Sequence, residues 1–302
     1  MLIAHVERYI RLRQTLGYKL HRKAENLRAF ARFAAERGKT HVCILMAMEW
    51  SAGASSAHAR HIRLRDVAHL ACFLRAEDPA HEVLSDLPRV PYYRLPPYIY
   101  TPEEIVQLIG AARRLRESYP LRRQVYATML GLIAATGLRI SEALDLRLPD
   151  VLPDGVLQIR RGKFGKSRLL PLHPTVVNAL GSYLEERRRL AVTDDHLFLS
   201  PGNQRIHSVL ANYTFRRIRR LAGIVPARAR QPRIHDLRHT FATRVLEQCS
   251  TQRDAIARHF VALSTYMGHT NIANTYWYLE ATPELMTDIA VAAEALIARE
   301  TV

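Results

Sequence analysis

The chain has 302 residues, of which 48% are hydrophobic and 24% charged, a balance that excludes a disordered protein. Lys and Arg number 44 against 28 Asp and Glu, a formal net charge of +16, so we expect a polyanionic partner, with nucleic acid ahead of an anionic membrane surface. The length suits two domains, and the longest apolar run, residues 125–138, is too short to span a bilayer.

The cysteines and the first residues bear on the compartment. No basic segment followed by an apolar one opens the chain, so a secretory signal peptide is not expected. Cys43, Cys72 and Cys249 lie far apart in largely apolar or helical surroundings and form no Cys-x-x-Cys pair. We expect three buried free thiols, which suits the reducing cytoplasm.

Residues 1–88 predict a helical domain. Apolar residues recur at helical spacing in residues 5–16, 24–38 and 56–75, and residues 42–50 are mostly apolar. We therefore expect a helix in each of these four segments. On the last helix one face carries Leu64, Val67, Ala71 and Leu74. The opposite face carries His58, His61, Arg65 and His69. This polar stripe fits a surface that follows nucleic-acid phosphates, and it equally fits an ordinary solvated face.

Residues 89–100 are rich in proline and tyrosine and cannot continue a helix, so they predict an extended interdomain linker. Basic residues exceed acidic ones on both sides of this linker. Two basic domains joined by an extended linker indicate a C-shaped clamp around a nucleic-acid duplex.

Residues 101–302 predict a second, mainly helical domain. It opens with Thr101-Pro102-Glu103-Glu104, a helix N-cap followed by proline and acidic residues. Residues 156–160 and 167–172 predict two strands of a β-hairpin. We expect helices at 121–136, from 141, and at 175–190, 208–222, 236–246, 254–266, 271–279 and 283–298. The fold class is therefore mainly α with a small β-hairpin, an α+β protein.

Residues 234–240, Ile-His-Asp-Leu-Arg-His-Thr, place His235, Arg238 and His239 on one helix turn. The four-residue step between the histidines is that of a zinc pair, but Arg238 stands between them and no glutamate follows His235. Imidazole exchanges protons near neutral pH, and guanidinium binds two phosphoryl oxygens. The turn therefore predicts a phosphate site, with no metal.

The hairpin tip and a nearby loop supply further cations. The tip is Gly162-Lys163-Phe164-Gly165-Lys166, which is not a P-loop because position 160 is arginine and no helix follows. A lysine there is solvated, binds a phosphate or protonates a leaving oxygen. A basic loop before the phosphate turn carries Arg228, Arg230 and Arg233.

Arg139 lies in a turn between two apolar helices, in Thr-Gly-Leu-Arg-Ile-Ser-Glu-Ala-Leu. Packing seldom requires an arginine at such a place. A salt bridge to Glu142 or Asp145 and a functional role are both open on this segment alone.

Six residues in this order resemble the active-site series of the tyrosine recombinases, the phage-integrase family. They are Arg139, Lys163, His235, Arg238, His269 in Met-Gly-His, and Tyr278 nine residues later. The resemblance covers residues 101–279 strongly and residues 1–88 more weakly, as a helical core-binding domain. It implies a catalytic domain over 101–302 with a helical tail at 280–302.

The resemblance implies site-specific DNA recombination through a covalent 3′-phosphotyrosine and a free 5′-hydroxyl. Tyr278 is then the nucleophile and Lys163 protonates the leaving 5′-oxygen. Arg139 and Arg238 bind the nonbridging oxygens of the phosphate. His235 assists proton transfer at the tyrosine, and His269 hydrogen-bonds the phosphate. No cofactor is required.

Two of these assignments have a neighbour as rival. Tyr276 lies about 200° around a helix from Tyr278, so only one of the two tyrosines faces the phosphate. The nine-residue step from His269 favours Tyr278. The family pattern likewise favours Lys163 over Lys166, which stays a candidate for DNA binding.

The resemblance also implies partners. We expect double-stranded DNA at specific sites, a tetramer on DNA, related recombinases or directionality factors as further partners, no membrane, and a place in the cytoplasm at the nucleoid. The tail fits packing on its own domain or on a neighbouring subunit. A recombinase of a mobile element or a chromosome-resolving one is expected, without an arm-binding domain. A type IB topoisomerase and a non-catalytic DNA-binding relative are the alternatives.

Overall fold

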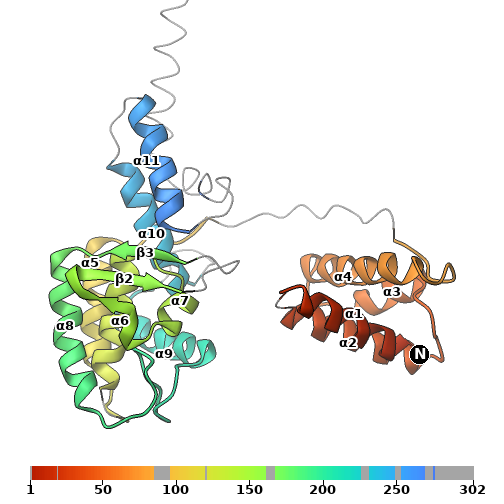
Figure 1. Cartoon of the computed structure of the whole chain (residues 1–302), viewed down its shortest axis with the longest axis horizontal. Helices are drawn as coiled ribbons and strands as arrows, with labels where there is room; N and C mark the ends of the chain where they lie inside the picture. The colour runs from red at the N-terminus through yellow and green to blue at the C-terminus, as the bar shows by residue number, and fades with distance from the viewer. Residues whose placement is uncertain are drawn as a thin grey trace, which may run out of the picture. The chain divides into compact units, whose positions relative to one another are not determined.

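The computed structural model describes residues 2–18, 20–84, 96–119, 121–160, 167–225, 231–248 and 253–268, together with Thr275. The chain divides into two compact units, Met1–Arg94 and Leu95–Val302, drawn in red to orange and in yellow to blue (Figure 1). Their boundary falls within residues 89–100. Across the described ranges, none of the helices combines the length and apolar content that crossing a membrane requires.

The described part of the first unit contains four helices, α1 (Leu2–Thr15), α2 (His21–Ala35), α3 (Ile44–Ala52) and α4 (Ala57–Arg75). Helix α4 contacts each of the other three and closes the core between them. All four helices were expected from the sequence, three from apolar spacing and α3 from a run of apolar residues. Helix α1 begins three residues earlier than the pattern indicated, because Leu2 is itself buried in the core.

Helix α4 has the two faces that its sequence predicts. Leu64, Val67, Ala71 and Leu74 are buried. His58, Arg65 and His69 are exposed, and His61 is half-buried. The expectation of buried thiols is wrong in this unit, because Cys72 lies next to Ala71 on the outer face of α4 and is exposed, while Cys43 is half-buried. Cys249 lies outside the described residues.

The second unit is built around α6 (Arg122–Thr136), which contacts four other helices. These are α5 (Pro102–Arg113), α7 (Ile140–Asp145), α8 (Pro174–Arg189) and α10 (Ile234–Glu247). Helix α9 (Ser208–Leu221) covers α5 and α7. Helix α11 (Arg253–Tyr266) lies beside α10, and a small separate core of Leu246, Phe260, Leu263 and Met267 joins the two (Figure 1).

A three-stranded antiparallel sheet has the order β1 (Val151–Leu152), β2 (Val156–Ile159) and β3 (Arg168–Pro171). The hairpin expected from the sequence is confirmed as β2 and β3, with Ile159 opposite Arg168 at the end next to the connecting turn. The tip, residues 161–166, lies outside the described residues. Strand β1 was not expected, because two residues are too few to show an alternating pattern.

The first residues of the second unit are fastened to α10. Thr101 caps α5: its hydroxyl accepts a hydrogen bond from the Glu104 amide, and the Glu104 carboxylate accepts one from the Thr101 amide. Tyr100 is fully buried, and its amide donates to the Thr240 hydroxyl at 2.9 Å. Arg244 donates to the Tyr100 carbonyl at 2.7 Å. The last residue of the predicted linker is thus part of the unit's core.

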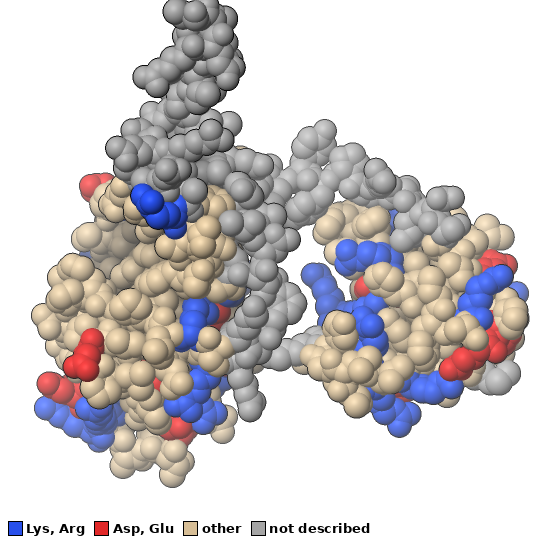
Figure 2. Space-filling view, turned by 45° about the horizontal axis from the view of Figure 1, so that its top comes forward, with Lys and Arg blue, Asp and Glu red and all other residues tan. Residues whose placement is uncertain are grey.

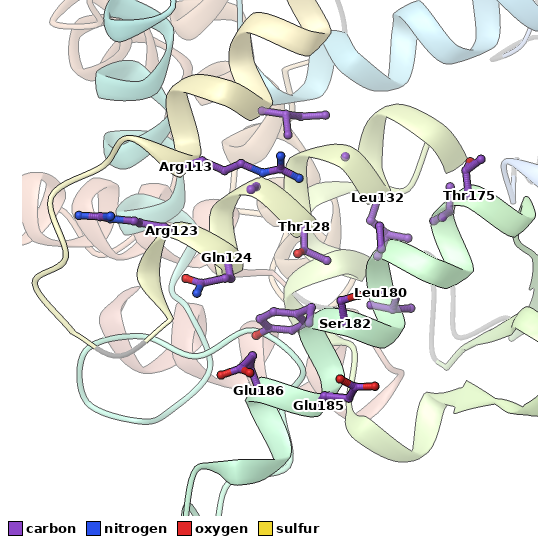
Figure 3. A pocket seen from close by; sticks show the side chains of 16 residues that line it. Arg113, Arg123, Gln124, Thr128, Leu132, Thr175, Leu180, Ser182, Glu185 and Glu186 are labelled. Carbon is purple, nitrogen blue, oxygen red and sulfur yellow. The ribbon is translucent and has the colours of Figure 1, made fainter.

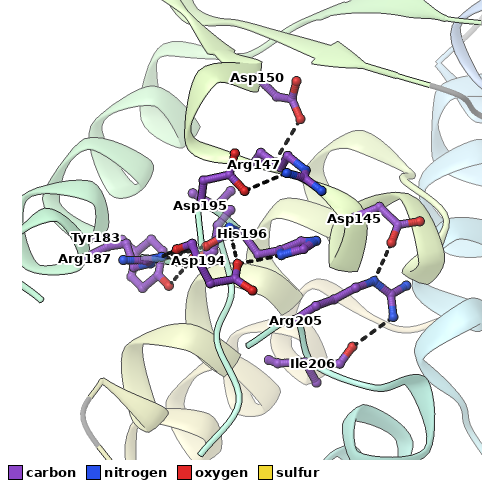
Figure 4. Close-up of polar contacts among 11 residues, drawn as sticks. Asp145, Arg147, Asp150, Tyr183, Arg187, Asp194, Asp195, His196, Arg205 and Ile206 are labelled. Carbon is purple, nitrogen blue, oxygen red and sulfur yellow. Dashed lines mark hydrogen bonds and ion pairs between the residues drawn. The ribbon is translucent and has the colours of Figure 1, made fainter. Parts of the chain in front are cut away.

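The second unit also contains a pocket and a buried arginine that lie away from α10. The pocket, of about 730 Å³, lies between α5, α6 and α8, with Arg113, Arg123, Glu185 and Glu186 among its lining residues (Figure 3). Below the sheet, the buried guanidinium of Arg187 binds the carbonyls of Asp194 and His196 and so holds the segment after α8 (Figure 4).

Candidate active site

Four helices and a strand meet at one place in the second unit. The end of α6, the start of α7, the first turn of α10, the end of α11 and the start of β3 all contribute polar groups here. Arg139, His235 and Arg238 belong to this place. Lys163, His269 and Tyr278 lie outside the described residues, as do Lys166, Arg228 and Arg230.

Arg238 is the most deeply buried of these groups, with 1% of its surface exposed. Its Nη1 donates to the Gly137 carbonyl and its Nη2 to the Met267 carbonyl at 2.8 Å. A buried guanidinium is costly unless its donors are satisfied, and carbonyls at the ends of α6 and α11 carry the partial negative charge that suits it. Arg238 thereby ties three helices together.

Gly137 makes this junction possible. It ends α6 with φ +61°, and a Cβ there would come within 2.5 Å of Phe241 and 2.9 Å of the Met267 sulfur. Only glycine combines that backbone conformation with so close an approach. The Gly137 carbonyl is thereby placed against Arg238.

Arg139 immediately precedes α7, and its side chain is 18% exposed. Its Nη1 donates to Glu142 Oε1 at 2.7 Å, while its Nη2 donates to the Gly268 carbonyl at 3.1 Å. Of the two salt bridges left open by the sequence, the structure contains the one to Glu142. Asp145 pairs with Arg205 instead.

Arg168, the first residue of β3, is a site residue that the sequence analysis missed. Its guanidinium donates to both oxygens of Glu142, at 3.1 and 2.9 Å, and its Nε donates to the Tyr266 carbonyl at 2.9 Å. A charged residue that opens an otherwise apolar strand, five residues after Lys163, was the available signal.

Glu142 is 5% exposed in its side chain and stands between the two guanidinium groups. Burial alone would raise its pKa, but the hydrogen bonds and charges of Arg168 and Arg139 outweigh burial and lower the pKa to about 2. The carboxylate is therefore ionised throughout the neutral range.

Three arginines thus bind three consecutive carbonyls at the end of α11. Arg168 binds the carbonyl of Tyr266, Arg238 that of Met267 and Arg139 that of Gly268. Gly268 has φ +66°, and a Cβ there would come within 2.9 Å of Arg168 Nη1. The next residue along the chain is His269.

His235 lies in the first turn of α10 and reaches the surface, although protein atoms surround most of its ring. Its pKa is lowered to about 4, first by loss of water around the ring and then by repulsion from Arg238 and Arg233. The ring is therefore neutral at pH 7. His239 is buried and meets it edge to face, with ring centroids 4.8 Å apart.

The described candidates for DNA binding have varied surroundings. Arg233 forms a two-pronged pair with the buried Asp236, at 2.9 Å, so its guanidinium is already engaged. Lys23 contacts His69 at 3.0 Å, and burial together with Lys23 lowers the pKa of His69. In the space-filling view Lys and Arg side chains are spread over both units (Figure 2). DNA contact by these residues stays a prediction.

Comparison with known proteins identifies the family. Residues 99–284 match the model of the phage integrase family, and the chain belongs to that family. Its curated relatives include tyrosine recombinases. The chain is accordingly an enzyme that breaks and rejoins DNA strands in site-specific recombination, and neither the topoisomerase nor the non-catalytic alternative is favoured.

The relatives include close and more distant proteins. The chain is 36% identical to y4rB of Sinorhizobium fredii, whose name assigns it to integrases/recombinases, over 94% of both chains. It is 33% identical to the tyrosine recombinase XerD of Caulobacter vibrioides, over 71% of this chain and 66% of XerD.

Solved structures share the fold. The Tn1549 transposon integrase in complex with transposon right end DNA matches with a TM-score of 0.67 and 20% identity, over 98% of this chain and 99% of that one. A lambda integrase tetramer bound to a Holliday junction matches with a TM-score of 0.63 and 18% identity, over 90% of this chain and 76% of that one. The expected fold class, mainly helical with a small sheet, is confirmed.

Proposed function

We propose that this recombinase cleaves DNA with Tyr278 as the nucleophile, in a site assembled from Arg139, Lys163, His235, Arg238 and His269. One observation carries the proposal. Arg139 and Arg238 bind the carbonyls of Gly268 and Met267, directly before His269. Two guanidinium groups therefore converge where the segment with His269 and Tyr278 begins.

Each residue has a chemical task in the proposed cleavage step. The Tyr278 oxygen attacks the phosphorus, the bond from phosphorus to the 5′-oxygen breaks, and the phosphate stays joined to the 3′-oxygen and to tyrosine. Lys163 gives its proton to the leaving 5′-oxygen. Arg139 and Arg238 stabilise the charge on the pentacoordinate phosphate through paired N–H donors.

The two histidines complete the step. His235 is neutral at pH 7 because its pKa is lowered to about 4, so it can accept the tyrosine proton. His269 hydrogen-bonds a nonbridging oxygen. Rejoining reverses the sequence with a 5′-hydroxyl from the other DNA partner, so the number of phosphodiester bonds is conserved and no cofactor is needed.

We propose further that the chain acts as a tetramer on two specific sites of duplex DNA. The solved relatives include a lambda integrase tetramer on a Holliday junction. In this proposal residues 1–88 form the core-binding domain, and α4 supplies phosphate contacts through His58, His61, Arg65 and His69. Related recombinases or directionality factors join the assembly, and the enzyme works on the nucleoid.

The test is to trap the covalent intermediate. Nicked duplexes that cover the DNA flanking the chain's own gene are incubated with the protein and resolved on denaturing gels. The wild-type chain and the matched control Tyr276→Phe are expected to form an adduct, and Tyr278→Phe is not. An adduct with Tyr278→Phe would overturn the choice of nucleophile. Peptide mapping of the adduct identifies the linked residue directly.

A further inference from the structure

The side chain of Arg168 makes several hydrogen bonds within the proposed site, which the first residue of a strand does not need. Its three N–H-bearing nitrogens all have acceptors: Nη1 and Nη2 bind the two oxygens of Glu142, and Nε binds the Tyr266 carbonyl. Its side chain is 14% exposed. Such a fork of parallel hydrogen bonds is specific to arginine, because the single ammonium of lysine cannot reproduce it.

The three contacts of Arg168 lead to three different parts of the site. Through Glu142 it reaches Arg139, which shares the same carboxylate at 2.7 Å. Through the Tyr266 carbonyl it holds the end of α11, two residues before Gly268 and three before His269. Its own backbone lies opposite Ile159, at the end of the β2–β3 hairpin where the connecting segment with Lys163 begins and ends.

Glu142 connects Arg168 to Arg139. It is a buried carboxylate between two guanidinium groups, and it also accepts a hydrogen bond from the Arg139 amide at 3.0 Å. Removing one partner of a buried, ionised group is costly, because it leaves charge and hydrogen-bonding groups in the network without a partner. The direction of the Arg139 side chain therefore depends on Arg168.

We propose that Arg168 is a positioning residue for DNA cleavage: by binding Glu142 and the Tyr266 carbonyl it holds Arg139 and the end of α11 against the start of β3. This inference rests on the proposed function, because it assumes that Arg139 binds the scissile phosphate. Arg168 itself acts through its neighbours and does not touch the phosphate.

The experiment compares Arg168→Gln and Arg168→Lys with a matched control, Arg147→Gln, in the full-length chain. Arg147 is also paired with a carboxylate, that of Asp195 at 2.8 Å (Figure 4), but its side chain is half-exposed. The substrate is the nicked duplex on which wild-type protein forms the covalent adduct. The rate of adduct formation with saturating protein is measured from pH 4 to 9, together with DNA affinity and thermal unfolding.

We expect Arg168→Gln to lower the adduct rate by about 100-fold, because a displacement of about 1 Å in a positioned group has that effect. DNA affinity stays within about threefold, since the phosphate contacts made elsewhere on the duplex are kept. Arg168→Lys restores most of the thermal stability but not the rate. Arg147→Gln matches wild type.

The pH profile separates positioning from mere stability. In the wild-type chain Glu142 stays ionised across the measured range, because its pKa is about 2. In Arg168→Gln only Arg139 opposes the effect of burial, so the pKa of Glu142 rises. Loss of the adduct rate on the acid side therefore begins at a higher pH in Arg168→Gln than in the wild-type chain.

Three results would overturn the inference: an adduct rate in Arg168→Lys equal to wild type, an unshifted acid limb in a folded Arg168→Gln, or additive losses in the double variant with Glu142→Gln. If Arg168→Gln does not fold, Arg168→Lys alone decides. Failure of the proposed function is distinct, because the wild-type chain itself would then form no adduct through Tyr278.

Discussion

At the scale of single residues, the arrangement of the site follows from its buried charges, because each of them needs a hydrogen-bonding or ionic partner. Arg238, Arg139 and Arg168 lie close together, and their mutual repulsion is offset by Glu142 and by backbone carbonyls at helix ends. Such carbonyls accept hydrogen bonds but carry no net charge. The guanidinium groups therefore keep an unneutralised positive field, which is what a phosphate in the transition state requires.

Arg238→Lys tests this arrangement, because a lysine cannot reach the carbonyls of Gly137 and Met267 at once. We expect the free energy of unfolding to fall by about 1 to 3 kcal/mol and the adduct rate to fall by about 100-fold or more. Chemical denaturation and the suicide-duplex assay measure the two effects.

The matched control is Arg189→Lys on α8, where the side chain is 70% exposed. We expect it to stay within about 0.5 kcal/mol of wild type. Wild-type cleavage by the Arg238→Lys protein would show that the paired donors of Arg238 are not needed.

The titration of His235 provides a second prediction at this scale. Its pKa of about 4 lies below the value near 6.5 of an unfolded chain, so the unfolded chain binds the proton more readily. The contribution of His235 to stability is therefore full above about pH 6.5 and is lost as the pH falls toward 4. NMR titration of the ring in DNA-free protein, assigned with His235→Gln, is expected to give a midpoint well below 6.5. A midpoint at or above 6.5 would contradict the neutral ring.

At the scale of elements, helix ends position the groups of the candidate site. Helix α6 stops at Gly137, α7 starts after Arg139, and α11 ends where three arginines bind its last carbonyls. The site is thus made where helices stop, because only there are backbone carbonyls left without a partner in the helix. Because the guanidinium groups bind these terminal carbonyls, a shift of one helix end would shift the guanidinium group bound to it.

Gly137→Ala tests the role of a helix end. The substitution introduces a side chain at φ +61° and within 2.5 Å of Phe241. We expect a loss of about 2 to 4 kcal/mol in the free energy of unfolding, from backbone strain and overpacking together. Urea denaturation measures the change.

Gly181→Ala in α8 is the matched control, since its Cβ would meet nothing within 4 Å. There we expect a gain of about 0.5 to 1 kcal/mol, because alanine favours the helix. If the two substitutions changed the free energy of unfolding equally, the close approach of Gly137 to Phe241 would not explain the loss.

At the scale of the whole molecule, the net charge of +16 dominates the encounter with DNA. Both units carry Lys and Arg on their surfaces (Figure 2). Each phosphate neutralised releases counterions, so binding must weaken as salt increases. Discrimination between DNA sequences must come from contacts to the bases and from DNA shape instead.

We expect DNA affinity to fall by roughly 10³-fold between 50 and 200 mM salt, as for a protein with several phosphate contacts. Fluorescence anisotropy on the cognate duplex, with an unrelated duplex of equal length as control, measures this. Both affinities should fall, while only the cognate duplex yields the covalent adduct. A loss of less than about tenfold would show that charge contributes little to binding.

Much of this organisation was predictable from the sequence alone, because local rules suffice for it. Apolar spacing and one apolar run located the four helices of the first unit, and Thr101 with Glu104 marked the start of α5. Arg139, His235 and Arg238 stood out as polar residues in turns that packing does not require, and their order along the chain indicated the family.

What the tertiary structure decided is which groups share an acceptor. Nothing local to Arg168 shows that it shares Glu142 with Arg139, because the carboxylate lies 26 residues upstream. Nor does periodicity reveal that Tyr100 is buried against α10. Residue types and spacing specify helices and candidate chemistry through short-range forces. The partners of a buried charge depend on which distant segments meet, and only the folded chain settles that.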